Sequence, residues 1–77
     1  MKIERAFVKK MIRNLPPIKA IPLLESFMLP KREHDAILYV DIKKFTIDEA
    51  ADILHTTSDT LKRRRKRAFD NIAKSLE

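Results

Sequence analysis

Six consecutive basic residues in the C-terminal quarter are the most chemically specific feature of this sequence: Lys62, Arg63, Arg64, Arg65, Lys66 and Arg67. Ammonium and guanidinium groups bind phosphate oxygens, and neutralising phosphates releases the counterions that surround a nucleic acid. The 77 residues include 17 basic and 11 acidic side chains, so the chain without this run is neutral. The whole excess charge of +6 therefore sits in one block, which predicts a polyanionic partner reached through one local feature.

The other reactive side chains form no catalytic or metal-binding set. The sequence has no Cys, which excludes disulfides, thiolate zinc sites and thiol nucleophiles. His34 and His55 are far apart and lack further ligands, so surface positions are expected for both. Ser58 next to Asp59 resembles part of a nucleophile set, but helix capping or a base contact explains the pair better. We therefore expect no enzyme activity, no metal and no cofactor.

Length and composition favour one small helical domain over residues 1–77. No apolar run reaches the roughly 18 to 20 residues of a membrane span, and the N-terminus does not resemble a signal peptide, so a cytoplasmic location is expected. The absence of Gly excludes Gly-rich phosphate loops and argues against tight β-hairpins. The predicted fold class is all-α, a small bundle of about five helices.

The sequence of the N-terminal part, residues 1–30, predicts one helix followed by a Pro-rich apolar segment. Apolar residues at helical spacing predict a helix over 2–14, which Pro16 and Pro17 end. Pro22 is expected to open a short second helix. Phe7, Met11 and segment 23–29 are interpreted either as core or as the surface of a homodimer.

Residues 31–77 contain the elements that must position the basic run. A helix is predicted over 31–40, followed by a connection at 41–45 that carries Lys43 and Lys44. Thr46 and Glu49 form a T-x-x-E capping box that starts a helix over 46–54. Thr57 can cap a last long helix, and the six basic residues lie inside it.

Two helices joined by about three residues predict a helix-turn-helix, in which the second helix enters the DNA major groove. Ala50 and Ala51 suit the first of them, because two helices must approach closely there. Residues 29–76 resemble the fourth region of bacterial sigma factors and the similar helix-turn-helix of many phage and mobile-element regulators. Three segments carry this resemblance in order: 29–38, 46–54, and 57–64 with Ala68.

The resemblance implies roles for individual residues. Base contacts are expected from the exposed side of the recognition helix, at Ser58, Asp59, Lys62, Arg63 and Lys66. Phosphate contacts are expected at Thr57, where it caps that helix, and at Lys43, Lys44, Thr46, Arg64, Arg65 and Arg67. For the two lysines a solvated loop is an equally good interpretation.

Two positions depart from the family pattern. His55 stands where the turn usually has Gly, so a left-handed backbone is expected at a residue that tolerates it better than most. Arg64 and Arg65 stand where the core-facing side of the last helix would often carry an aliphatic residue. One of the two is therefore expected to run along the edge of the core on its aliphatic stem.

The predicted function is sequence-specific binding of double-stranded DNA by residues 57–67, in transcription regulation in a bacterium, phage or mobile element. The alternatives are a module that binds RNA polymerase or another regulator through the apolar N-terminal third, and a DNA-recognition subunit of a recombination or packaging machine. Few aromatic residues are present and none interleaves with the basic run, which argues against a stacking platform for single strands.

Overall fold

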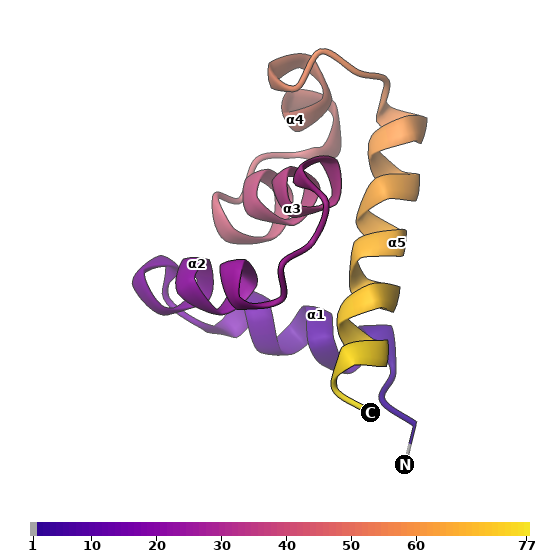
Figure 1. Ribbon diagram of the computed structural model, residues 1–77. Helices are drawn as coiled ribbons and strands as arrows, with labels where there is room; N and C mark the ends of the chain where they lie inside the picture. The colour runs from indigo at the N-terminus through magenta and orange to yellow at the C-terminus, as the bar shows by residue number, and fades with distance from the viewer. Residues whose placement is uncertain (1) are drawn as a thin grey trace.

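The computed structural model describes residues 2–77, which form five α-helices and one π-helical turn, as predicted for the fold class. The longest helix, α5, runs along one side of the molecule, and α4, α3 and α2 are stacked beside it from its N-terminal toward its C-terminal end (Figure 1). The elements are α1 (Arg5–Asn14), α2 (Pro17–Ser26), α3 (Lys31–Ile37), the π-helical turn η1 (Leu38–Ile42), α4 (Ile47–Ile53) and α5 (Ser58–Ser75).

The prolines end α1 as expected, but they begin α2 earlier than expected. Leu15 is extended because Pro16 follows it, so α1 ends at Asn14. The prediction that the second helix opens at Pro22 is wrong: it begins at Pro17, whose fixed φ suits a first helical position. Pro22 lies inside α2 and cannot donate to the carbonyl of Ile18. That residue is 81% exposed, so water can reach the carbonyl.

The third helix continues further than predicted. The backbone N–H of Lys43 donates to the carbonyl of Leu38 at 2.9 Å, five residues back, which closes the wide turn η1. The prediction of a connection over 41–45 is therefore wrong at its start, because Asp41 and Ile42 are helical and buried. Ile42 joins the apolar core, and Asp41 is held by two arginines.

One core cluster fixes the helix-turn-helix. Ala50 and Ala51 of α4 are buried against α5, which confirms the prediction that small residues let these helices approach. Leu61 of α5 is fully buried in the same cluster, and truncating such a leucine to Ala costs about 2–5 kcal/mol. Ala36 and Val40 close the cluster from α3 and η1. The first half of α5 is therefore held on one side by three other elements.

A second cluster packs α1 and α2 against the other half of α5. Val8, Ile12 and Leu24 are fully buried in it, so one face of α1 and one face of α2 belong to the core. Phe7, by contrast, is 61% exposed, and the core interpretation is wrong for this residue. Leu24 belongs to the segment 23–29, which was interpreted either as core or as a contact surface, and its burial confirms the core interpretation for this residue.

Candidate nucleic-acid interface

Each helix of the helix-turn-helix begins at a hydrogen-bonded cap. The Thr46 hydroxyl accepts from the Glu49 N–H at 3.2 Å, while a Glu49 carboxylate oxygen accepts from the Thr46 N–H at 3.0 Å. This is the predicted capping box. The Thr46 N–H, and after it the Thr46 hydroxyl, hold the pKa of the Glu49 carboxyl below its ordinary value. At the next helix the Thr57 hydroxyl accepts from the Thr60 N–H at 3.2 Å, as predicted.

The turn between the two helices has the left-handed residue that the sequence predicts. His55 has a φ of 55°, and its N–H donates to the Asp52 carbonyl at 3.2 Å. The Thr56 N–H donates to the Ala51 carbonyl at 2.9 Å. These two bonds make a Schellman motif, which satisfies the last carbonyls of α4 and reverses the chain within three residues.

A hydrogen bond between two side chains joins the first turn of α4 to the first turn of α5. The Ser58 hydroxyl donates to the Asp48 carboxylate. Ser58 was expected to face a base edge, but in the structure its side chain braces α5 against α4. The start of α5 is thus held against α4 as well as capped.

The basic run divides into three directions because an α-helix turns once every 3.6 residues or so. Asp59, Lys62, Arg63 and Lys66 recur at spacings of three and four and are all exposed, so they share one outward face. We call these four residues the outward face of α5. Four of the five residues that were predicted to contact base edges lie on this face, and the fifth is Ser58.

Arg65 points in the opposite direction, into the molecule. Its side chain is only 19% exposed, and its guanidinium pairs with Asp41, which is fully buried. The Arg65 guanidinium also lies 5.3 Å from the centre of the Phe69 ring. Arg65 is therefore the residue that runs along the core edge, and its guanidinium is not directed outward toward a phosphate.

Arg64 and Arg67 occupy the side of α5 that faces α3. Together with Thr60 they line a groove whose other wall is the start of α3, including Lys31 and Arg32. Sequence reasoning did not assign these two α3 residues to the site. The available signal was a pair of basic residues directly after Pro30, at a predicted helix start.

Lys43 and Lys44 are exposed in the short connection before α4. The Lys43 ammonium lies 4.6 Å from the centre of the Tyr39 ring, and the Lys44 ammonium donates to the Arg13 carbonyl at 3.2 Å. The Lys44 backbone has a φ of 65°, so this connection also reverses through a left-handed residue. Both ammonium groups thus have contacts within the protein and remain accessible to solvent.

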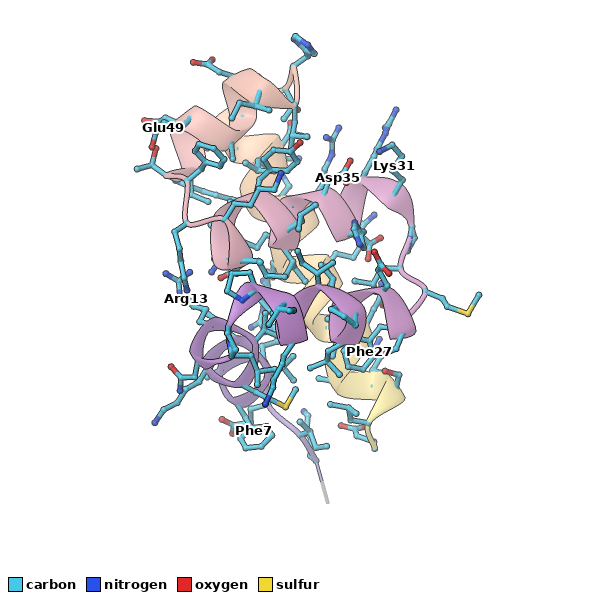
Figure 2. All side chains as sticks on the ribbon, turned by 90° about the vertical axis from the view of Figure 1, so that its left-hand side faces the viewer. Phe7, Arg13, Phe27, Lys31, Asp35 and Glu49 are labelled. Carbon is cyan, nitrogen blue, oxygen red and sulfur yellow. The ribbon has the colours of Figure 1, made fainter. Side chains whose placement is uncertain are left out.

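The two histidines have different surroundings in the structure. The Nδ1 atom of His34 lies 3.4 Å from an Asp35 carboxylate oxygen, whereas His55 forms the turn. Over residues 2–77, His, Asp and Glu side chains nowhere gather in threes that could hold a metal ion. The Lys31 ammonium forms an ion pair with Asp35 at 3.1 Å, and Figure 2 shows both side chains on α3.

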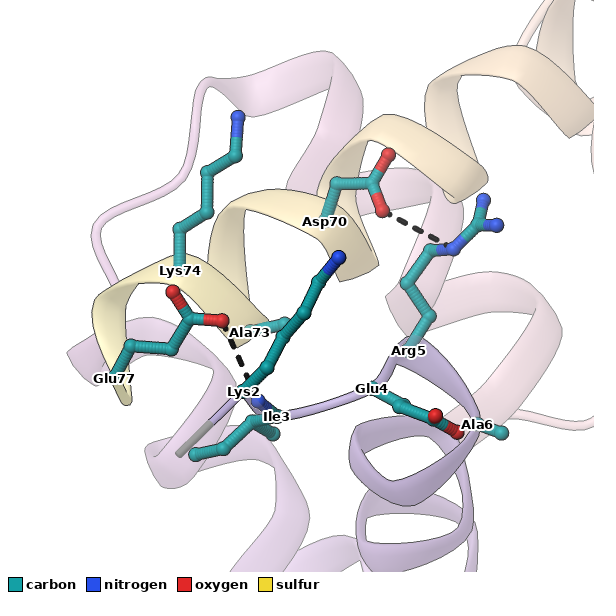
Figure 3. A pocket seen from close by; sticks show the side chains of 9 residues that line it. All are labelled: Lys2, Ile3, Glu4, Arg5, Ala6, Asp70, Ala73, Lys74 and Glu77. Carbon is teal, nitrogen blue, oxygen red and sulfur yellow. Dashed lines mark hydrogen bonds and ion pairs between the residues drawn. The ribbon is translucent and has the colours of Figure 1, made fainter.

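A larger hollow of about 560 Å³ lies where the N-terminal segment meets the end of α5 (Figure 3). An ion pair between Arg5 and Asp70 at 3.1 Å crosses it, and the Ile3 N–H donates to a Glu77 carboxylate oxygen at 3.3 Å. Cations and carboxylates are both present in its walls, so this hollow has no single sign of charge that would favour a polyanion. Its contacts join the first and last segments of the fold.

The comparison with protein families supports the sequence resemblance. The family described as Sigma-70, region 4, matches residues 28–72, which span the segment from just before α3 to most of α5. The chain belongs to the sigma-70 region 4 family. That family is a DNA-binding helix-turn-helix domain, in agreement with the capped helix pair described above. Searches of curated proteins and of solved structures gave no match.

The matched segment contains every residue of the outward face of α5, the groove beside α3 and the connection with Lys43 and Lys44. It excludes α1 and α2 entirely, so the sigma-70 region 4 domain here carries an additional helical layer that packs against the second half of α5. None of the helices within residues 2–77 has the length and apolar character to cross a membrane.

Proposed function

We propose that this sigma-70 region 4 domain binds double-stranded DNA sequence-specifically and acts in transcription regulation. The observation that carries the proposal is the outward face of α5, where three cations and one carboxylate are exposed together on a capped, rigid helix. A helix of this kind fits the major groove of B-DNA.

The chemistry of the outward face supports base readout. Arg63, Lys62 and Lys66 can donate to guanine O6 and N7, and Asp59 can accept from the cytosine amino group. The proposed phosphate contacts flank this face at Thr57, Arg64 and Arg67, and those of the connection and of the first cap are Lys43, Lys44 and Thr46. Arg65 and Ser58 hold the helix in position through Asp41 and Asp48.

The test is duplex binding by the Lys62→Ala/Arg63→Ala double variant. We expect weaker binding and a salt dependence flattened by about two charge contacts. The matched control is Lys9→Ala/Lys10→Ala, which removes the same charge from exposed positions of α1. Equal binding by the two double variants would contradict the proposal.

Selecting bound sequences from random duplex DNA resolves the role further. An enriched motif supports specific readout, and a symmetric motif with two half-sites about one helical turn apart indicates a dimer. A subunit of a recombination or packaging machine would enrich its own site in the same way, and transcription measured from a promoter carrying the motif separates it from a regulator.

The runner-up function is a protein-interaction module that binds RNA polymerase. Phe7 and Ile18 favour it, because both are large apolar side chains exposed by 61% and 81% on α1 and α2. If the exposed side chain of Phe7 contacts polymerase, Phe7→Asp abolishes co-purification with polymerase while leaving duplex binding intact. The same variant tests a homodimer, which would show a concentration-dependent mass that Phe7→Asp removes.

A further inference from the structure

The groove between α3 and α5 gathers cations from two elements that are distant in sequence. It encloses about 430 Å³, and its cationic side chains are Lys31, Arg32, Arg63, Arg64 and Arg67. Thr60 adds a hydroxyl from the first turns of α5. Helix α3 brings two of the cations and α5 brings three, so the charge density exists only in the folded protein.

Two carboxylates lie near these cations: Asp35 forms an ion pair with Lys31 at 3.1 Å, and Glu33 lines the groove. Glu33 is the one carboxylate in the groove walls, and it is 9% exposed and accepts a hydrogen bond from the Asn71 amide at 2.6 Å. That bond ties α3 to α5 below the groove. Among residues 2–77, Arg32, Arg63, Arg64 and Arg67 form no ion pair.

Like charges held this close repel one another. Arg67 follows Arg63 by four residues and Arg64 by three, which are the spacings at which side chains on a helix are neighbours. An anion between them removes the repulsion. The planar guanidinium fork matches phosphate oxygens in geometry, so phosphate is the anion that this set of side chains favours.

The shape of the surface favours a strand over a small anion. A second hollow of about 200 Å³ shares Arg32 and Arg64 with the groove, and its other walls are Asp35 of α3 and Leu54 and His55 at the turn. A track of basic side chains therefore runs from Arg67 through Arg64 and Arg32 toward the turn, and the one carboxylate beside it there, Asp35, is paired with Lys31. Arg63 belongs both to this track and to the outward face of α5, so a strand in the track would belong to the duplex that α5 reads.

We propose that the groove between α3 and α5 binds phosphate groups of the DNA backbone, with Lys31 and Arg32 as contacts contributed by α3. This inference rests on the proposed duplex binding and extends it to a second helix. While α5 contacts the bases, Lys31 and Arg32 of α3 then bind the backbone of one DNA strand. These phosphate contacts fix the position of the domain along the duplex.

The decisive variant is Arg32→Gln, because Arg32 is exposed and glutamine is as good a helix former as arginine. Its control is Lys19→Gln, which removes one positive charge from an exposed position of α2. Relative to the control, we expect about fivefold weaker duplex binding near 0.15 M salt and a salt slope smaller by about one. The sequence preference selected from random duplexes should stay the same. Equal affinity and equal slope in the two variants would overturn the proposal.

A second arm distinguishes this proposal from the proposed function. If the wild-type chain binds no duplex at all, the proposed function fails, and the groove is tested by pyrophosphate followed through the arginine Nε–H resonances. Shifts at Arg32 and Arg67 of the wild type, with the Arg67 shift lost in Arg32→Gln, would then assign the groove to free polyphosphate. An unshifted spectrum would reject phosphate binding by the groove altogether.

Discussion

The guanidinium of Arg65 donates two hydrogen bonds to the buried carboxylate of Asp41. The Arg65 Nε atom donates to Asp41 Oδ2 at 2.8 Å, and Nη2 donates to Oδ1 at 2.6 Å. Arg13 adds a third bond, from Nη1 to Oδ1 at 2.7 Å. These residues belong to α5, η1 and α1, and Arg13 lies outside the family match. One carboxylate thus joins α5 to the additional N-terminal layer.

Replacing Asp41 with Asn should destabilise the fold strongly. Asp41 is fully buried, and the substitution leaves Arg65 without a compensating charge, which costs about 3 kcal/mol in comparable buried pairs. Equilibrium urea unfolding measures the loss. The control is Asp35→Asn, which removes an ion pair to the 87% exposed Lys31 and should cost less than about 1 kcal/mol. Similar small losses in both variants would contradict the proposed importance of the buried pair.

Arg63 and Arg65, two residues apart in the basic run, should respond in opposite ways to substitution by Gln. Arg63→Gln should weaken duplex binding about tenfold, the equivalent of one base contact, with unfolding unchanged. Arg65→Gln should cost about 2 kcal/mol of stability, because Asp41 then keeps only Arg13. Binding isotherms and urea unfolding of the same two proteins test this. Equal effects of both substitutions on DNA binding would refute the assignment of Arg63 and Arg65 to different faces of α5.

Local sequence patterns predicted the helix-turn-helix well because its signals are local. The capping box at Thr46, the cap at Thr57 and the left-handed turn at His55 each depend on residues within a few positions of one another. The pattern also showed that Arg64 and Arg65 could not both face the groove. It could not say which one turns inward, since that is decided by Asp41, 24 residues away.

The features that sequence reasoning missed depend on long-range contacts. Asp41 follows the apolar Val40 and was assigned to a connection, because no neighbour in sequence indicates the arginines that make its burial possible. The groove was missed for the same reason, since Arg32 and Arg67 meet only after α3 packs on α5. The early start of α2 was missed because Pro22 suggested the beginning of a helix. A proline inside a helix leaves the carbonyl four residues earlier without a donor, and the sequence does not show that this residue, Ile18, is exposed to water.

The capping box should make stability depend on pH through Glu49. Its pKa is lower in the folded protein than in the unfolded chain, because the Thr46 N–H and hydroxyl favour the charged carboxylate. The stabilisation is thus complete above the ordinary glutamate pKa, and it is lost as the pH falls through the lower, folded value. Thermal midpoints between pH 7 and pH 3 should fall less steeply for Glu49→Gln, which keeps a hydrogen-bond acceptor but cannot ionise. Superimposable pH profiles of wild type and variant would argue against a role for the charge.

Glycine at position 55 should stabilise the protein. His55 holds a φ of 55°, and an exposed non-glycine residue in this region stores strain that glycine does not. We expect His55→Gly to raise the free energy of unfolding by about 0.5 kcal/mol, after the greater entropy of glycine in the unfolded chain is subtracted. His55→Ala is the control, because it removes the side chain and keeps the Cβ. A gain with Ala equal to that with Gly would place the effect in the imidazole and not in the backbone of the turn.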